Sequence, residues 1–311
     1  MARMALLGSI LLHNIIPLCV MILIGVVLQR IFVLDIRTLS KLNFYLFSPA
    51  VIFKLLYTTD IPFSLIGQVL LFFGVFMAFQ YALVEIVIRL RGFQGGMKAA
   101  MRNSVLFYNS ANYGIPLNQL AFAANPFTLS IQVLVMMMQS LLPNTYGIYS
   151  VNAHKSSFRD IRRTILSQPV IYVIPLAFAL RGFGVGIPVY LATPLDYVAN
   201  AFIGTALLTL GVQLGSMKRG SGKGKTADLG LSLALRLAAG PALAALTVWL
   251  LGIDGLAAKA LIVSSAVPTS LSSVLLAVEF DNEPEFSSQA VLFSTILSIG
   301  TVTAVIALLQ I

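Results

Sequence analysis

The residues with the clearest potential for chemistry lie between positions 109 and 116, inside an apolar stretch that otherwise predicts a membrane-spanning helix. This segment contains two amides, a glycine and a proline within eight residues: Asn109, Asn112, Gly114 and Pro116. An interrupted helix in hydrocarbon costs several kcal/mol for each unsatisfied backbone group, unless protein or water replaces the lost hydrogen bonds. Discontinuous helices of this kind form substrate sites near the bilayer midplane in secondary transporters. The segment therefore predicts a binding site for a transported molecule.

A second polar interruption lies at residues 264–273, where serines and a threonine surround Pro268. Pro116 and Pro268 are separated by 152 residues, and so are Pro17 and Pro169, which begin the predicted first and sixth spans. Simple packing between membrane helices also uses glycine, proline, serine and threonine, and it is the alternative for either segment alone. Two interruptions at corresponding positions of two halves instead favour one shared binding site. The N-termini of their half-helices would offer free N–H groups to an anion.

The composition predicts the class of protein in which these segments lie. The chain has 311 residues, of which 58% are hydrophobic and 10% are charged, and its mean hydropathy is +0.93. Because a soluble domain carries about 25% charged residues, we expect an all-α polytopic membrane protein. Spans of about 20 residues use nearly the whole chain and leave no room for a soluble domain. The N-terminal apolar stretch predicts a permanent span rather than a cleaved signal.

Ten spans can be drawn, and the basic residues fall unevenly on the two sides of the membrane. The spans are predicted at residues 11–31, 38–58, 64–89, 99–122, 128–150, 164–182, 188–215, 228–251, 257–279 and 285–309. Sixteen of the 20 lysines and arginines then lie on one side, Arg236 near a span end among them, which leaves Arg3, Lys54, Arg181 and Lys259 opposite. Because basic loops stay in the cytoplasm, this bias predicts a plasma-membrane protein with both termini outside. The net charge of +9 is thus a topology signal and not a sign of nucleic-acid binding.

The basic loop at residues 153–163 divides the predicted spans into two groups of five, at residues 1–152 and 164–311. An odd number of spans in each half means that an internal duplication is inverted in the membrane. We therefore expect two inverted five-helix repeats, in which the fourth and ninth helices are broken and crossed.

Polar residues in the second and seventh spans are predicted to have accessory roles. Ser48-Pro49 is expected to break the second span, and Gln213 lies in the corresponding seventh span. Lys54 follows Pro49, and a charge inside a span predicts a functional role by default. Two interpretations of Lys54 stay open: it extends to the outer surface of the membrane, or it attracts anions there.

The sequence predicts neither a metal centre nor an enzyme. The chain contains one cysteine, Cys19, and two histidines, His13 and His154. These residues are too few for a transition-metal site of the usual composition. No arrangement of a nucleophile with a base is found in the spans, so we expect no cofactor and no intramembrane catalysis.

Taken together, these segments resemble the auxin efflux carrier family, which includes bacterial dicarboxylate transporters and the plant PIN carriers. The resemblance covers nearly all of the chain in order, and no single motif carries it alone. It rests on Ile16-Pro17 with Gly25, on Leu39–Asn43 with Phe47–Phe53, and on Asn109–Leu117, Leu210–Leu214 and Val267–Glu279. The chain lacks the long cytoplasmic loop of the PIN carriers and so resembles the compact prokaryotic members.

The resemblance implies a fold shared with bile-acid sodium symporters, in which spans 4 and 9 are unwound and cross at Pro116 and Pro268. Spans 1, 2, 6 and 7 would form a scaffold, and spans 3–5 and 8–10 a transport domain that moves against it like an elevator. The family binds its organic anion at the crossover. The corresponding positions here are Asn109, Asn112, Gly114, Pro116 and Pro268. The neighbouring Tyr113, Val267, Thr269 and Ser270 are also predicted to bind the substrate. Tyr113 fills a position that is often smaller in the family, so the identity of the substrate stays open.

The sequence thus predicts a secondary transporter that moves a small carboxylate, such as malate, malonate or an auxin-like acid, by alternating access. A membrane ligand sensor of the same fold and a channel are the alternatives. Coupling to Na⁺, coupling to H⁺ and uniport all stay open, because no carboxylate ligand for a cation stands out near the crossover. The expected partners are the organic anion and membrane lipids, and homodimer formation is left open.

Overall fold

The computed structural model describes residues 16–58, 63–152, 169–216 and 226–311, together with 157, 159, 162, 163, 166 and 167. His13, His154, residues 1–15 and most of the predicted basic loop lie outside the described residues. The described part is helical, with no strand beyond one isolated β-bridge. It is an all-α membrane protein, as the composition predicts.

The first half of the chain forms helices that follow the predicted spans closely. In order they are α2 (Ile16–Phe32), α3 (Ile36–Leu42), the π-helix η2 (Asn43–Phe47), α4 (Ser48–Thr58), α5 (Phe63–Arg91), α6 (Gly95–Leu106), α7 (Gly114–Ala121), α8 (Pro126–Leu142), the π-helix η3 (Pro143–Gly147) and α9 (Ile148–Asn152). The predicted fourth span is therefore two helices, α6 and α7, with non-helical residues between them.

The described residues of the second half are also helical. It contains α11 (Pro169–Gly182), α12 (Val189–Ser216), α13 (Thr226–Ala234), the π-helix η4 (Leu235–Ala239), α14 (Gly240–Leu250), α15 (Gly255–Ser265), α16 (Ser272–Glu279) and α17 (Pro284–Leu309). The predicted ninth span is likewise two helices, α15 and α16.

Within the described residues, five helical runs are long and apolar enough to cross a membrane: Ser64–Arg91, Pro126–Val151, Val189–Ser216, Thr226–Leu250 and Pro284–Leu309. Four shorter apolar helices accompany them, at Cys19–Phe32, Tyr45–Thr58, Ile171–Gly182 and Gly255–Ser265. Helices lie in each of the ten predicted ranges, and the number of membrane crossings stays a prediction.

The second segment differs from the expectation at Ser48-Pro49, where the sequence predicts a break. The chain instead passes from α3 through η2 directly into α4. A π-helical turn inserts one extra residue into the helix, and here it accommodates the proline without a break. Asn43 in this turn is buried and donates a hydrogen bond of 2.7 Å to the hydroxyl of Thr209 on α12. The turn thus joins the second segment to the seventh.

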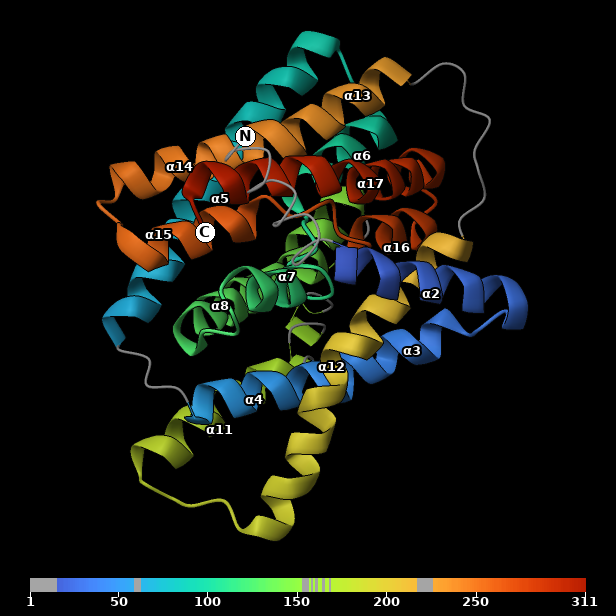
Figure 1. Cartoon of the computed structure of the whole chain (residues 1–311). Coiled ribbons are helices and arrows are strands. Elements are labelled where there is room, and N and C mark those ends of the chain that lie inside the picture. Colours follow the sequence, from blue (N-terminus) through green and yellow to red (C-terminus); the bar gives the residue numbers. More distant parts are fainter. Residues whose placement is uncertain are drawn as a thin grey trace, which may run out of the picture.

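The helices pack in two groups. α2 packs along α12, and α4 packs against both α11 and α12. In the other group α14 packs on α15 and α5, and α17 packs on α13 and α16. Figure 1 shows α2, α3, α4, α11 and α12 together in the lower part of the view, with α13 to α17 above them. The helices α7 and α8 lie between the two groups in this view.

Candidate functional site

The two interrupted segments lie against each other as a short antiparallel pair. The backbone N–H of Asn109 donates to the carbonyl of Pro268 at 2.8 Å, and the N–H of Ser270 donates to the carbonyl of Phe107 at 2.8 Å. These bonds form an isolated bridge between Tyr108 and Thr269. Residues from the two predicted interruptions, more than 150 positions apart in the chain, are thus neighbours. We call this region, residues 107–113 and 266–271, the crossover.

The carbonyls at the end of α6 all have partners from outside that helix, although a helix end normally leaves them unpaired. Ser104 O accepts from the hydroxyl of Thr269 at 2.8 Å, and Phe107 O accepts from Ser270 N. Leu106 O accepts from the side-chain amide of Gln139 on α8 at 3.1 Å. These bonds replace the hydrogen bonds that an unbroken helix would have made, which is the condition for a helix break inside a membrane.

A tight turn within the crossover places the two asparagines. The side-chain oxygen of Asn109 accepts from the N–H of Asn112 at 3.1 Å, and its backbone carbonyl accepts from the N–H of Gly114 at 2.9 Å. Gln132 on α8 donates to the carbonyl of Ser110 at 2.8 Å. A Cβ on Gly114 would collide with the amide nitrogen of Gln132. A side chain at position 114 would therefore displace the Gln132 amide from the carbonyl of Ser110.

Two residues of the predicted site are placed differently from the expectation. Pro116 is buried in the first turn of α7 and not in the interruption itself, which ends at Tyr113. A proline is tolerated there because the first N–H groups of a helix have no partner within it. Tyr113 is buried, and its hydroxyl oxygen accepts from Ser298 on α17 at 3.0 Å. The tyrosine thus connects the crossover to the last helix.

The second interruption contains the remaining predicted residues. Val267 and Thr269 are buried, and the N–H of Thr269 donates to the hydroxyl of Ser294 on α17 at 3.1 Å. The hydroxyl of Ser270 accepts from the N–H of Ser272, the first residue of α16, at 3.2 Å. Pro268 supplies the carbonyl that pairs with Asn109. The structure therefore brings together the predicted residues of both interruptions.

Several buried polar atoms in the crossover or beside it have no hydrogen-bond partner among the described residues. They include the side-chain nitrogen of Asn109, the hydroxyl of Tyr108, the side-chain oxygen of Gln132 and the hydroxyl of Ser264. Most buried polar groups in proteins are hydrogen-bonded. A buried donor such as the Asn109 amide is therefore able to bind an acceptor group of a ligand.

Arg236 also contacts this region. The sequence predicts it near a span end, but it lies inside the apolar run Thr226–Leu250 and its side chain is 0% exposed. Its guanidinium donates to the carbonyl of Val105 at 2.9 Å and to that of Ser265, and it lies 4.7 Å from the ring centre of Tyr108. One feature of the sequence could have indicated this role of Arg236: a charged residue within a membrane span is expected to be functional.

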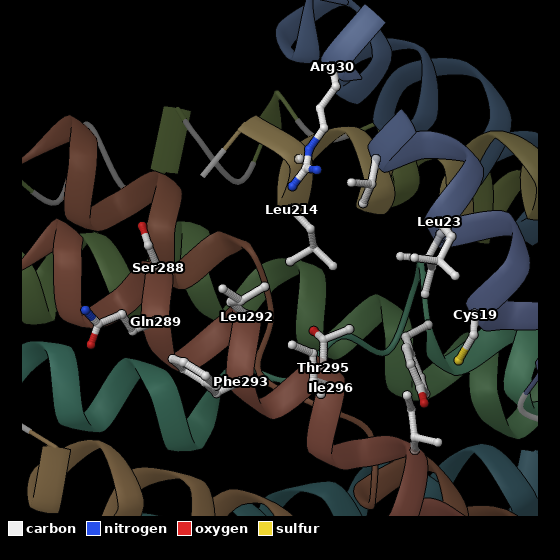
Figure 2. A pocket seen from close by; sticks show the side chains of 15 residues that line it. Cys19, Leu23, Arg30, Leu214, Ser288, Gln289, Leu292, Phe293, Thr295 and Ile296 are labelled. Carbon is white, nitrogen blue, oxygen red and sulfur yellow. The ribbon is translucent and has the colours of Figure 1, made fainter. Parts of the chain in front are cut away.

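A cavity of about 600 Å³ lies between α2, α12 and α17 and reaches the crossover at Tyr113. Figure 2 shows Arg30 at one end, with Cys19 and Leu23 of α2 on one side and Leu292 and Ile296 of α17 among the residues across from them. The other predicted substrate-binding residues do not line it. The lining is mostly apolar, and its polar members are Arg30, Tyr113, Ser288, Gln289, Thr295 and Cys19. Such a cavity suits a molecule with an apolar body and an acidic group.

The predicted accessory residues are not among those that line this cavity. Ser48 is buried where η2 passes into α4, and Gln213 is buried in α12. Lys54 forms an ion pair of 2.8 Å with Asp196 on α12, and the two side chains are 33% and 50% exposed. Asp196 is 142 residues away from Lys54 in the chain. This ion pair is not part of either interpretation that the sequence leaves open for Lys54, extension to the outer surface or attraction of anions. In the described part of the chain, no three His, Cys, Asp or Glu side chains gather as metal ligands would.

Comparison with known proteins assigns the chain to a family. A family model described as membrane transport protein matches residues 10–306. An uncharacterized transporter from Methanothermobacter thermautotrophicus is 24% identical over 297 residues, which cover 92% of this chain and 94% of the relative. Auxin efflux carrier component 3a of Oryza sativa subsp. japonica is 27% identical over 141 residues, 44% of this chain but 23% of the carrier. Auxin efflux carrier component 2 of Arabidopsis thaliana is 26% identical over 141 residues, 44% of this chain and 22% of the carrier. The chain therefore belongs to the membrane transport protein family, that of the auxin efflux carriers, and is a multi-pass membrane transporter.

Proposed function

We propose that this protein is a secondary transporter that moves a small organic anion across the plasma membrane by alternating access. The observation that carries the proposal is the pairing of the two interrupted helices at Asn109 and Pro268. Broken helices that meet in this way build substrate sites in other secondary transporters. The names of the plant relatives refer to auxin, an organic acid, which supports an organic anion as the substrate class here.

The chemistry of the crossover favours an anion. The unpartnered amide nitrogen of Asn109 is a donor, and the helices α7 and α16 begin near it with their partly positive N-termini. The first N–H groups of both helices already have acceptors within the crossover, so these helices contribute their dipoles and not the free N–H groups that the sequence predicts. The guanidinium of Arg236 adds a full positive charge behind Tyr108. Asn112 is half-buried and would donate from its side chain to a carboxylate that enters from the cavity.

The packing of the helices supports a division into a fixed and a moving part. In this proposal ten spans form two inverted five-helix repeats, with both termini outside the cell. The scaffold comprises α2, α3, α4, α11 and α12, which contact one another. The transport domain comprises α5 to α9 and α13 to α17. The cavity at Tyr113 lies between α2 and α12 of the one and α17 of the other, where an alternating-access pathway would run.

Flux measurements in proteoliposomes test this function. Purified protein should exchange labelled carboxylates against unlabelled ones with saturation and counterflow, and protein-free liposomes should not. The variant Asn112→Ala should fold normally and lose most of this flux. Binding of carboxylates without flux would contradict transport and indicate a ligand sensor. Flux without saturation or counterflow would indicate a channel.

A further inference from the structure

The buried charge of Arg236 is not explained by anion binding alone. Among the buried residues of the described part, Arg236 is the one charged side chain. It lies in η4, in the middle of an apolar run. A charged group at mid-membrane is costly and is kept there by specific partners. An arginine cannot lose its proton in a protein, so this charge is permanent.

The two backbone partners of Arg236 share one property: they are carbonyls at the C-terminal ends of the two broken half-helices. Val105 is the penultimate residue of α6, and Ser265 is the last residue of α15. The C-terminus of a helix carries a partial negative charge. One guanidinium thus neutralises two helix ends, one from each half of the chain. The guanidinium of Arg236 is thus bound by backbone carbonyl oxygens in the way that a metal cation would be.

The local structure is built to hold a guanidinium. The ring of Tyr108 lies 4.7 Å from the Arg236 Cζ atom, and the side-chain oxygen of Gln80 on α5 accepts from Nη1 at 3.4 Å. A Cβ on Gly240 would lie 2.7 Å from Nη2 and 3.2 Å from Cζ, so glycine leaves the space that the planar group fills. The π-helical turn lies directly before this glycine. The Tyr108 ring, the Gln80 side chain, the space at Gly240 and the π-helical turn therefore shape the site together with the two helix ends.

Transporters with broken helices use the C-terminal ends of their half-helices and unwound carbonyls to bind the co-transported cation. Here those oxygens already have a permanent cation as partner. A second cation beside Arg236 would be repelled by it and would find the carbonyls of Val105 and Ser265 engaged. These observations bear on coupling, which the sequence left open.

We propose that Arg236 is the resident cation of the crossover: it joins the ends of α6 and α15 and takes the charge position of a coupling ion, so that anion transport requires no sodium. Arg236 is then a positioning residue whose charge also balances the substrate anion. The part of this inference that concerns sodium rests on the proposed transport function, because it is tested by flux. Its structural part can be tested without any substrate.

The first experiment measures the thermal stability of purified protein. Arg236→Ala should lower the melting temperature by about 5 °C or more, because two buried carbonyls and the Tyr108 ring lose their cation. Millimolar guanidinium chloride should restore much of that loss, since the free ion fits the space beside Gly240. Arg89→Ala, which removes an exposed arginine of α5, should show neither the loss nor the restoration. A variant that guanidinium does not restore would contradict the bridging role.

The second experiment measures anion flux in sodium medium and in medium with N-methyl-D-glucamine in its place. Wild-type flux should be equal in the two, and a sodium requirement would overturn the proposal. Arg236→Lys, which keeps the charge, should retain the wild-type KM, whereas neutral Arg236→Gln should raise it by about tenfold. Equal KM values in both variants would reduce Arg236 to a structural role. If no anion is transported at all, the proposed transport function is wrong. The guanidinium experiment still tests whether Arg236 joins the ends of α6 and α15.

Discussion

Gly25 of α2 and Gly211 of α12 meet with no side chain between them. A Cβ on Gly211 would lie 2.8 Å from the Cα of Gly25 and would collide with the carbonyl oxygen of Ile22. Small residues allow membrane helices to approach closely, and this approach supplies packing energy where lipid gives no hydrophobic drive. The contact joins the first and seventh predicted spans, one from each half of the chain.

Gly211→Ala is therefore expected to destabilise the protein by about 1–3 kcal/mol, because the obstacle is backbone that cannot rotate away. Thermal unfolding in detergent measures the effect. The matched control is Gly204→Ala on the same helix, where the nearest atom to the added Cβ is the terminal carbon of Met21 at 4.0 Å. If the two variants melt at the same temperature, close approach at Gly211 does not contribute to stability.

Asn109→Asp tests the buried amide as a donor to an anion. The aspartate keeps the oxygen that accepts from Asn112 N, so the turn is retained, but it replaces the unpartnered donor by a negative charge. Because like charges at close range cost several kcal/mol, the KM for the anion should rise by about a hundredfold or more. Concentration-dependent uptake measures this change.

The control for that variant is the same chemical change at another turn. Asn125 caps α8, and its side-chain oxygen accepts from Phe127 N at 3.0 Å and from Thr128 N at 3.3 Å. Aspartate caps helices as well as asparagine does. Asn125→Asp should therefore transport like the wild type. Normal uptake by Asn109→Asp would remove Asn109 from the binding site.

Lys54→Gln is expected to leave the KM for the anion unchanged, because Asp196 already neutralises the lysine. The stability change should also be small, about 1 kcal/mol or less for a partly exposed pair. Asp196→Asn leaves the lysine charge unbalanced and should lower the KM, most clearly at low ionic strength, where screening is weak. A raised KM in Lys54→Gln would instead support its role in attracting anions.

Cys19 offers a direct test of the cavity, because the chain has no other cysteine. A bulky maleimide attached to Cys19 should block flux by filling the space next to Tyr113. Saturating substrate should slow the labelling, which mass spectrometry follows. Cys19→Ser should transport and should be insensitive to the reagent. Full activity after complete labelling would exclude the cavity from the substrate pathway.

The two interruptions could be predicted from the sequence because asparagine, glycine and proline act on the backbone locally. Their positions, together with hydropathy, also gave the approximate bounds of the helices. The exact site of each break could not be predicted in this way. Pro116 is compatible with the first turn of a helix, so the backbone unwinds before it, and Pro49 is accommodated by a π-helical turn. Both outcomes depend on which partners the freed carbonyls find.

The role of Arg236 could not be predicted, because its partners are distant in the chain. Val105 is 131 residues away and Ser265 is 29 residues away, and both contribute backbone oxygens that no residue type reveals. The same holds for the ion pair of Lys54 with Asp196. The effect of a side chain on its own segment can be predicted from the sequence. A contact between distant elements can be identified only once the fold is known.

The antiparallel bridge between Tyr108 and Thr269 has a consequence for affinity. Because the unwound backbone pairs with itself and with side chains of α8 and α17, the crossover holds its shape before any ligand arrives. Ligand binding then does not have to order a loop, so no conformational entropy of the loop is lost. The affinity for a small ligand is higher as a result. A single β-bridge in a helical protein thus allows even a molecule with few polar groups to be held firmly.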